Sequence, residues 1–382
     1  MESIQWGDLT PETFLKEYWQ KKPLLIKQAM PNFQGTIEAD ELAGLAMEQE
    51  IESRIIAQNP DKTWHVEHGP FDDFEKFGED NWTLLVQAVN NWSRETDKLI
   101  SLFTFIPRWR IDDVMVSFST PNGGVGAHLD QYDVFILQGE GKRRWQVGAP
   151  DNTLETLIPH PDLKQVSEFI PIIDAITEPG DLLYIPPNHP HNGVSIENSV
   201  NYSIGFQAPS NQDLWSAFAD KLIDEELGEQ RFSDENSEIS NSPYQLKEND
   251  LNQIKAFMLN QLSDEQLFSQ YISQYLTQSH HTLELLIPME AFTTEQVTDF
   301  LDDDEIQFTP VSGIKALVCC SPTSNSFING ERFELSEETA RLGNYLAGSE
   351  PMTMKKAKSF MTCLKNTQLL TSVLNKGYWY IE

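Results

Sequence analysis

Hydrophobic and polar positions alternate with different periods along the chain, and the period changes twice. Residues 9–20 (LTPETFLKEYWQ) place apolar side chains at helical spacing behind Thr10, which is typical of a helix cap. Helical spacing also occurs at 38–47 and at 80–92. Short apolar runs in KKPLLIKQA and ESRIIAQ predict strands. The N-terminal part is therefore predicted to mix helices with short strands.

Between residues 113 and 207 the pattern becomes that of a β structure. VMVSFST, DVFILQGEG, KRRWQVGA, DLLYIPP and SVNYSIGFQA are short runs separated by clusters of Gly, Pro and Asn. Such runs are typical of an antiparallel barrel or sandwich. GEGKRRW predicts a hairpin turn followed by a strand.

The C-terminal part predicts helices first and a mixed unit afterwards. DLWSAFADKLIDEEL and NDLNQIKAFMLNQLSDEQLFSQYISQYL have helical spacing and flank a polar linker at 232–243. Later strands are expected in EIQFTP, GIKALVCC and YWYIE, a hairpin in FINGERFEL, and helices in SEETARLGNYLAG and CLKNTQLLTSVLNKG. We expect an α+β chain with three parts: 1–208 with the barrel, 209–284 helical, and 285–382 resembling a winged helix.

The charge balance bears on the class of partner. The 382 residues include 27 Lys and Arg against 59 Asp and Glu, a formal net charge of −32. Such a chain repels phosphate backbones and anionic membranes, and its field favours a basic partner. Solubility explains the charge equally well. We expect no direct DNA binding and no membrane association.

Cysteine content and the N-terminus indicate the compartment. The chain has three Cys and no CxxC pair, which counts against a disulfide framework or a zinc–cysteine site. No basic region followed by an apolar run opens the chain, and no later stretch suits a membrane helix. A cytoplasmic protein is expected.

A candidate metal site lies in the β-rich segment. His128 and Asp130 are two apart, so on an extended segment they point to the same side. A further His follows in IPPNHPHNG, where His189 and His191 are both candidates and Pro190 makes it improbable that both face the metal. Two imidazoles and one carboxylate are the ligand set of non-haem iron(II) oxygenases, which leave positions open for a cosubstrate and oxygen.

A cosubstrate with two carboxylates needs a cation at the end remote from the metal, and Arg binds carboxylates best. Arg143 and Arg144 are adjacent on one strand, so alternation lets only one enter the barrel, and the residues alone do not decide which. Polar side chains that could accompany it inside are Ser117 and Ser119 on VMVSFST, and Asn201 and Ser203 on NYSIGF.

WTLLVQAVNNW, FIPRWRIDDVMVSFSTPNGGVGAHLDQYDVFILQGEGKRRWQVG, EPGDLLYIPPNHPHNG, NYSIGF and NKGYWYIE together closely resemble the bacterial ribosomal oxygenases. These Jumonji-C proteins hydroxylate an arginine of large-subunit ribosomal protein L-sixteen. The resemblance implies a double-stranded β-helix (jelly-roll, cupin-type) barrel that uses Fe(II), 2-oxoglutarate and O2. It also implies a helical dimerisation region, and hence a homodimer, before the winged helix.

Site roles follow from the same resemblance. It implies His128, Asp130 and His191 as iron ligands, Arg143 as the clamp for the remote carboxylate, and Ser117 as a further contact. His189 departs from the family by replacing an apolar residue, and we expect it to be an exposed loop residue. Gln131, Tyr132 and Asp133 are candidates for holding the guanidinium of the target arginine, because they adjoin the HLD motif.

Two other functions compete with this one. A cupin-type metalloenzyme acting on a small molecule without 2-oxoglutarate would share the barrel, because a jelly roll does not determine the reaction. A nucleic-acid-binding regulator could use the winged helix, although the net charge of −32 counts against it. Oxygen-dependent conversion of 2-oxoglutarate to succinate would distinguish an oxygenase from the cupin-type metalloenzyme. A salt-dependent shift of DNA in a binding assay would support the nucleic-acid-binding regulator.

Overall fold

A computed structural model describes residues 3–235, 242, 244–320, 324–348 and 350–382. No helix within these residues is both long and apolar enough to cross a membrane. Part of the linker expected at 232–243, namely residues 236–241 and 243, lies outside the described residues.

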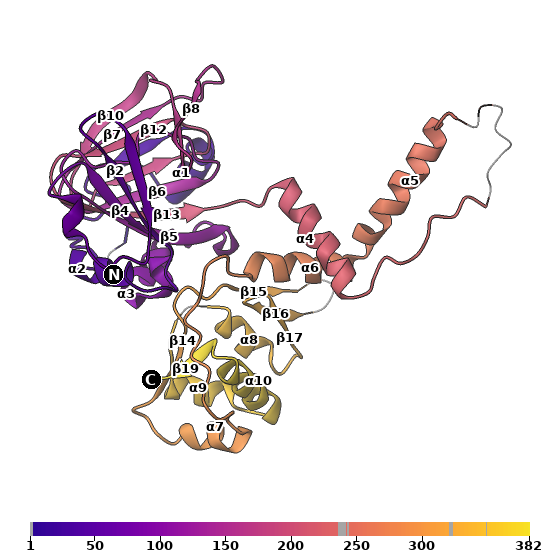
Figure 1. The fold of residues 1–382 in the computed structure, drawn as a ribbon. Helices are drawn as coiled ribbons and strands as arrows, with labels where there is room; N and C mark the ends of the chain where they lie inside the picture. Colours follow the sequence, from indigo (N-terminus) through magenta and orange to yellow (C-terminus); the bar gives the residue numbers. More distant parts are fainter. Residues whose placement is uncertain (1–2, 236–241, 243, 321–323, 349) are drawn as a thin grey trace. The chain divides into compact units, whose positions relative to one another are not determined.

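The chain folds into two compact units, each described by itself below (Figure 1). The first unit comprises residues 1–208 together with 280–284, and the second comprises 209–279 together with 285–382. The division into three parts that the sequence suggests stays a prediction.

The first unit is a barrel of two facing antiparallel sheets. The larger sheet contains, in spatial order, β1 (Leu24–Ile26), β11 (Leu182–Ile185), β6 (Asp133–Glu140), β13 (Ser199–Phe206), β5 (Ile111–Ser119), β4 (Trp82–Val86), β2 (Ser53–Gln58) and β3 (Trp64–His68). The smaller sheet contains β10 (Pro171–Thr177), β7 (Arg143–Gly148) and β12 (His191–Ser195), and a separate hairpin is formed by β8 (Thr156–His160) and β9 (Leu163–Val166). The predicted jelly-roll barrel is confirmed.

Alternation along β6 shows how one strand serves two cores. Val134 and Ile136 point between the two sheets and pack with Trp145 of β7. Phe135 points to the other face of the larger sheet, where it belongs to the largest apolar cluster of the unit. A strand buried on both faces therefore divides the interior of the barrel from the core under the N-terminal helices.

The N-terminal helices cover the outer face of the larger sheet. They are α1 (Pro11–Glu17), α2 (Ala39–Leu45) and α3 (Arg94–Asp97), with short 3-10 segments η1 (Glu75–Phe77), η2 (Val89–Asn91), η3 (Lys98–Phe103) and η4 (Arg108–Arg110). Thr10 caps α1, because its Oγ1 accepts a hydrogen bond from the backbone N of Thr13 at 3.2 Å. Phe14 of α1 is fully buried, with its ring 4.9 Å from that of Tyr184. The predicted first helix is confirmed.

Two local predictions are wrong. The helix expected at 80–92 is instead the strand β4 followed by η2, because every residue of β4 is buried and the strand lacks an alternating pattern. GEGKRRW is no hairpin: β6 pairs with β11 and β13, whereas β7 pairs with β10 and β12. The turn at Gly141 therefore carries the chain from one sheet to the other.

The second unit begins with helices and ends in small sheets. Its helices are α4 (Asn211–Asp224), α5 (Glu248–Asn260), the 3-10 segment η5 (Gln261–Ser263), α6 (Glu265–Thr277), α7 (Thr294–Phe300), α8 (Ala340–Leu346), α9 (Met354–Phe360) and α10 (Leu364–Asn375). One sheet contains β15 (Ala316–Cys319), β16 (Asn325–Ile328) and β17 (Glu331–Glu334), and the other β18 (Met352–Thr353), β14 (Gln307–Pro310) and β19 (Trp379–Ile381).

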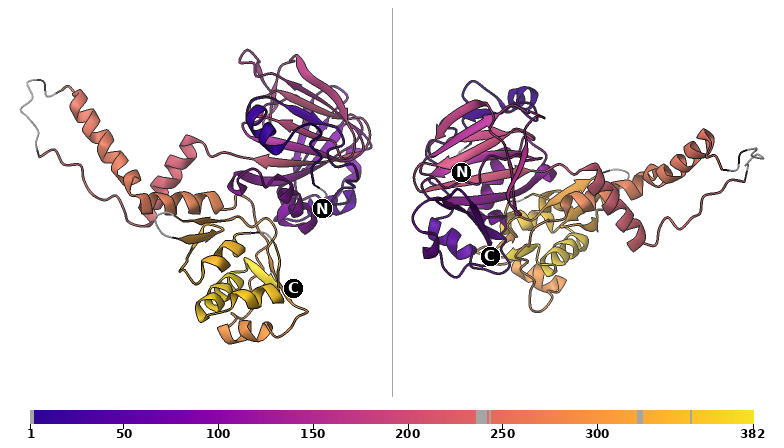
Figure 2. Two further views of the ribbon diagram at one scale, coloured as in Figure 1. Left: turned by 180° about the vertical axis from the view of Figure 1, so that it is seen from behind. Right: turned by 45° about the horizontal axis from the view of Figure 1, so that its top comes forward.

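Turn chemistry in this unit matches the prediction. Asn329 and Gly330 join β16 to β17 with φ angles of 48° and 79°, which is why an Asn-Gly pair stands at this turn. Among the helices, α5 contains no buried residue and projects away from the rest of its unit in both Figure 1 and Figure 2.

Candidate active site

Backbone hydrogen bonds bring the two ends of the HxD motif and the later His together. The backbone N of His128 donates to the O of His191 at 3.0 Å, and the reverse bond has the same length. The carbonyl of Asp130 accepts from the backbone N of Asn188 at 2.7 Å. The loop between β5 and β6 is thereby held against the start of β12.

The three side chains converge on one point. Oδ2 of Asp130 lies 3.5 Å from Nε2 of His191 and 3.8 Å from Nε2 of His128. One potential ligand atom from each residue lies within 4.8 Å of the other two. Such a cluster of two imidazoles and one carboxylate suits an iron(II) ion with open coordination positions.

The other ring nitrogens hold the imidazoles in place. Nδ1 of His128 lies 2.9 Å from the carbonyl O of Gly126, and Nδ1 of His191 lies 3.0 Å from that of His189. In neutral imidazoles each Nδ1–H donates to its carbonyl, which leaves the Nε2 lone pair free for a metal.

The protonation states of His128 and Asp130 suit metal binding. Burial, and to a smaller extent the charge of His191, lower the pKa of His128 to about 4, so this imidazole is neutral at pH 7. Burial opposes ionisation of Asp130, but the hydrogen bond from His191 and the charge of His128 outweigh it and lower its pKa to about 2. No proton has to leave before a cation binds these two groups.

His189 is buried, and the expectation of an exposed loop residue is wrong. Only 4% of its surface is exposed, and its Nδ1 lies 3.0 Å from the carbonyl O of Pro187. The loop folds inward because the backbone N of Gly148 donates to the carbonyl of Pro190 at 2.7 Å. His189 does not line the cavity that contains the other two histidines.

That cavity has a volume of about 310 Å³ and extends from the triad into the barrel. Arg143 lies in it, is 5% exposed, and donates to the hydroxyls of Ser119 and Ser199. Its guanidinium carbon is 5.8 Å from the centre of the Trp145 ring. Arg144 points outside, where its Nε and Nη2 donate to the carboxylate of Asp174 at 2.7 and 2.6 Å.

The environment of Arg143 lacks a counter-ion. Within the described part of the chain its only hydrogen-bond partners are hydroxyls, and its buried Nε has none. Burial lowers the pKa of this guanidinium to about 9. A buried cation without an acidic partner is destabilised until an anion binds, so the cavity fits a carboxylate ligand that reaches from the triad to Arg143.

The other predicted polar residues divide into two groups. Ser117 lines the cavity, as does Ser203. Ser119 lies beneath it, bonded to Arg143 and to Oγ1 of Thr83 at 2.8 Å. Asn201 is also outside its lining and donates to Oε1 of Gln138 at 2.8 Å. Ser119 and Asn201 can support the cavity wall, whereas Ser117 can touch a ligand.

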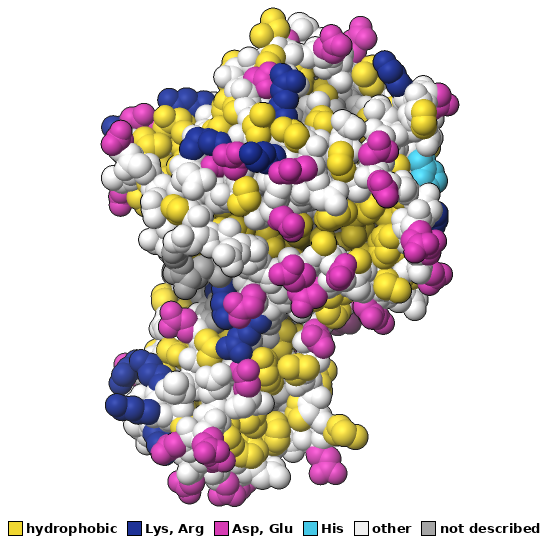
Figure 3. Space-filling model, turned by 90° about the vertical axis from the view of Figure 1, so that its left-hand side faces the viewer, with side chains coloured by type: hydrophobic (Ala, Val, Ile, Leu, Met, Phe, Trp, Pro, Cys, Tyr) yellow, Lys and Arg dark blue, Asp and Glu magenta, His cyan; other side chains and the backbone are white. Residues whose placement is uncertain are grey.

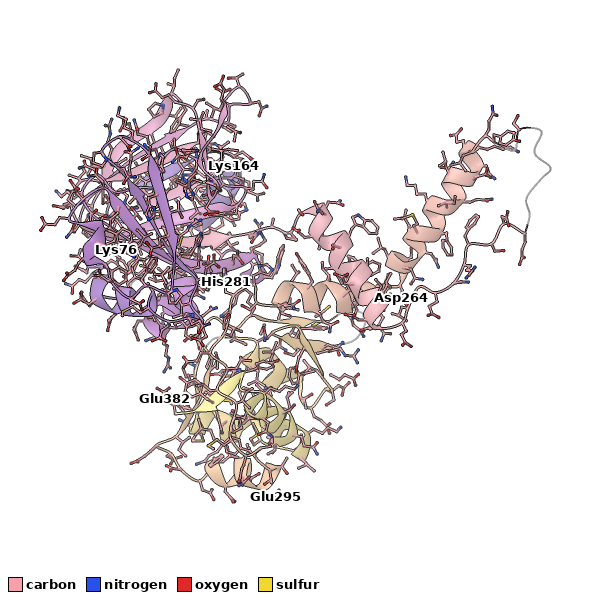
Figure 4. The ribbon with its side chains drawn as sticks, viewed as in Figure 1. Lys76, Lys164, Asp264, His281, Glu295 and Glu382 are labelled. Carbon is pink, nitrogen blue, oxygen red and sulfur yellow. The ribbon has the colours of Figure 1, made fainter. Side chains whose placement is uncertain are left out.

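The mouth of the cavity corrects one prediction and adds residues. Tyr132 lines the mouth, but Asp133 points into the opposite core, where it accepts from Tyr184 at 2.6 Å and from Gln20 at 3.0 Å. Strand β9 also borders the cavity, and its Lys164 is labelled in Figure 4. Arg54 of β2, which was not predicted from the sequence, also lines the cavity together with Ile56, because residues two apart on a strand face the same side.

A second cluster of possible metal ligands was also missed. Asp112, Asp113 and His281 place ligand atoms within 4.8 Å of one another. His281 gave no signal in the sequence, because residues 280–284 return to the barrel unit from far along the chain. His280 makes a similar contact, with its Nδ1 3.1 Å from Oδ1 of Asp112.

Known families match both parts of the chain. Residues 98–214 match a JmjC domain, and residues 260–380 match a ROXA-like winged helix. The ribosomal protein uL16 3-hydroxylase of Escherichia coli (strain K12) is 39% identical over 100% of this chain and 98% of its own length. A probable ribosomal oxygenase of Haemophilus influenzae is 32% identical over 85% of this chain and 82% of its own.

A solved structure agrees with both matches. YcfD, a ribosomal oxygenase from Escherichia coli in complex with cobalt and 2-oxoglutarate, superposes with a TM-score of 0.89 at 38% identity. The match covers 100% of this chain and 99% of that one. The chain therefore belongs to the ribosomal oxygenases, a family of Jumonji-C 2-oxoglutarate oxygenases.

Proposed function

We propose that this chain hydroxylates an arginine side chain of the large-subunit ribosomal protein uL16, using Fe(II), 2-oxoglutarate and O2. The carrying observation is a single cavity that contains the triad His128, Asp130 and His191 together with the buried guanidinium of Arg143, which lacks an acidic partner. The relative that is 39% identical over the full length of this chain bears the name uL16 3-hydroxylase.

In this proposal the triad holds the iron. His128 and His191 offer Nε2 because their Nδ1 atoms are bonded to backbone carbonyls, and Asp130 offers an ionised carboxylate. Bound iron supplies the coupling of O2 reduction to decarboxylation of 2-oxoglutarate and to oxidation of a C–H bond. The protein contributes orientation of the two substrates and exclusion of water.

Arg143 binds the carboxylate of 2-oxoglutarate that is remote from the metal. Ser119 and Ser199 hold the guanidinium from below, and the Trp145 ring lies beside it. Ser117 contributes a hydroxyl to the same cavity. An anion at this position also offsets the desolvation of a cation that is 5% exposed.

A basic protein substrate suits the surface. The net charge is −32, and on the face in Figure 3 acidic side chains are spread widely while Lys and Arg gather in a few places. Opposite charge accelerates encounter with a ribosomal protein and disfavours direct DNA binding. At the cavity mouth, Tyr132 and Asp162 are available to the target side chain. Ribosomal proteins are found in the cytoplasm, which is where this enzyme would act.

The helices of the second unit are proposed to form a homodimer. On α5 the side chains of Leu251, Ile254, Phe257, Met258 and Leu259 are between 36% and 61% exposed. A second copy of the chain would bury them, since two-fold pairs are the commonest solution for such surfaces. Phe218 of α4 is not available to such a contact, because it is buried in its own chain with its ring 4.9 Å from that of Tyr271.

The test is incubation of the iron-loaded protein with 2-oxoglutarate, ascorbate and free uL16, followed by peptide mass spectrometry. The expected result is a gain of one oxygen on a single arginine, together with succinate. Omission of 2-oxoglutarate is the control and should abolish the gain. If metal-dependent turnover of a small molecule proceeds without 2-oxoglutarate, the cupin-type alternative holds instead.

A further inference from the structure

The active-site cavity contains a second guanidinium, that of Arg54 on β2. Its Nε is buried and has no hydrogen-bond partner. Within the described residues no hydrogen bond or ion pair joins Arg54 to another side chain. Like Arg143, it presents a cation to the cavity without a protein anion to neutralise it, and such a group favours an anionic ligand.

The strand register places Arg54 at a defined depth. In the register of the larger sheet, one level at the floor of the cavity contains Ile56, Thr83, Ser119 and Ser199, and the next level contains Arg54, Leu85, Ser117 and Asn201. Arg143 donates to two hydroxyls of the floor layer. Two residues along a strand span about 7 Å, so Arg54 originates about 7 Å above the floor.

The metal triad lies in the same direction from the floor. On β12, Ser195 is the register partner of Arg143, and His191 lies four residues nearer the mouth as the partner of Val147. Arg54 is therefore on the triad side of Arg143, and it projects from the larger sheet while Arg143 projects from the smaller one. The two cations approach the cavity from opposing walls and at different depths.

This separation matches the shape of the cosubstrate. A five-carbon chain with bonds of about 1.5 Å separates its two carboxyl carbons by roughly 5 Å. A guanidinium at each end can then donate to one carboxylate over the usual distance of about 2.8 Å. The target arginine is itself a cation, and like charges repel, so Arg54 is poorly suited to hold that side chain.

We propose that Arg54 binds the carboxylate next to the keto group of 2-oxoglutarate, so that Arg54 and Arg143 hold the two ends of the cosubstrate. Arg54 is then a cosubstrate-binding residue on the metal side of the cavity. The proposal rests on the use of 2-oxoglutarate but not on the identity of the hydroxylated protein.

The test is calorimetric binding of three ligands to the cobalt-loaded full-length protein. They are 2-oxoglutarate, levulinate, which has a methyl group in place of the metal-side carboxylate, and 2-oxovalerate, which lacks the remote carboxylate. Arg54→Gln should weaken 2-oxoglutarate and 2-oxovalerate by roughly tenfold or more, the usual effect of losing a charge-assisted contact. Its affinity for levulinate should stay within about twofold of the wild type. Arg143→Gln should show the converse pattern, with levulinate weakened and 2-oxovalerate retained.

Two further variants control for the loss of an arginine outside the cavity and for the loss of folding. Arg144→Gln removes the same functional group from the outer face, where Asp174 holds it, and should leave all three affinities unchanged. Arg54→Lys retains the charge and should recover part of the loss, which also provides a folded variant if Arg54→Gln does not fold. Wild-type affinity of Arg54→Gln for 2-oxoglutarate, or equal weakening of all three ligands, overturns the proposal. The three calorimetric affinities do not depend on uL16 hydroxylation.

Discussion

The barrel interior and the helices of the second unit depart from the usual distribution of side chains in opposite ways. The barrel buries the Nε atoms of two arginines, Arg143 and Arg54, without hydrogen-bond partners. Helix α5 exposes apolar side chains instead, such as Met258 at 61%. Each departure is unfavourable in the isolated chain. The first indicates a small polar ligand, and the second a protein surface.

Removal of a metal ligand should have the largest effect on activity, because the barrel then no longer holds the iron. His128→Ala, Asp130→Ala and His191→Ala should each lower turnover by roughly a thousandfold or more, since a site with three protein ligands loses one. His189→Ala is the matched control and should keep most of the activity. Turnover is measured as hydroxylated peptide per minute. An inactive His189→Ala beside an active His191→Ala would reverse the ligand assignment.

Arg143→Ala should raise the KM for 2-oxoglutarate by about a hundredfold, the effect of losing a buried, charge-assisted pair of hydrogen bonds. Arg144→Ala should leave it nearly unchanged, because this side chain is bonded to Asp174 on the outer face. Initial rates of succinate formation across a range of 2-oxoglutarate concentrations give both constants. The opposite ranking would mean that the ligand does not reach the floor of the barrel.

Charged substitutions on α5 test whether its exposed apolar side chains form the dimer interface. Ile254→Glu combined with Met258→Glu on α5 should raise the dissociation constant of the dimer by roughly thirtyfold, because the buried apolar contacts become charged. Asn252→Glu adds a charge to the same exposed helix and should have little effect. Analytical ultracentrifugation at micromolar concentration measures the change. A wild-type mass of 43.6 kDa, that of one chain, would exclude the dimer.

The pH dependence of the free energy of unfolding tests whether burial keeps His128 neutral. The pKa of His128 in the folded chain is about 4, against an ordinary value of 6.5, so the unfolded chain binds this proton first. The metal-free protein should therefore lose stability as pH falls from about 6.5 towards 4, by roughly 1.5 kcal/mol at pH 5 for this group.

His128→Gln has no imidazole at this position, so its free energy of unfolding should fall less between pH 6.5 and pH 5, by roughly the 1.5 kcal/mol attributed to His128. Urea unfolding followed by tryptophan fluorescence measures this free energy. His65→Gln, which changes an exposed imidazole, should retain the slope of the wild type. Identical slopes for all three proteins would mean that burial does not keep His128 neutral.

Salt should have the smallest effect. Raising ionic strength from about 0.01 to about 0.15 M shortens the screening length from about 30 to about 8 Å. The KM for uL16 should rise by roughly threefold to fivefold, because the net charge of −32 no longer attracts a basic partner over the same range. The maximal rate at saturating 2-oxoglutarate should hardly change. A KM independent of salt would assign the acidic surface to solubility alone.

Local signals in the sequence predicted the elements whose cause is local. Thr10 marks the start of α1, and Asn329 with Gly330 marks the turn of a hairpin, because capping and positive φ depend on neighbouring residues. The same reasoning placed helix at β4, since burial on both faces removes the alternation that identifies a strand. Pairing of β6 and β7 with different sheets depends on distant strands.

In the candidate site, too, the features with a local cause were predicted and those that depend on distant residues were not. Spacing brought His128 and Asp130 to one side of a loop, whereas the burial of His189 depends on a backbone bond between Gly148 and Pro190 that no spacing reveals. Arg54 was overlooked because it lies far from the motif in sequence and enters the cavity through the order β5, β4, β2 in the sheet. Residues that share a cavity through strand order can be found only once the register is known.

The proposed reaction is tested most directly by following the two atoms of dioxygen. The iron-loaded protein is incubated with 2-oxoglutarate and uL16 under heavy-isotope dioxygen, and both products are weighed by mass spectrometry. We expect one labelled oxygen in succinate and one in an arginine of uL16, in equal amounts. Loss of that label in Arg143→Ala at low 2-oxoglutarate, with recovery at high concentration, would tie it to the buried guanidinium. Hydroxylated uL16 without labelled succinate, or labelled succinate without any labelled protein, would exclude the proposed reaction.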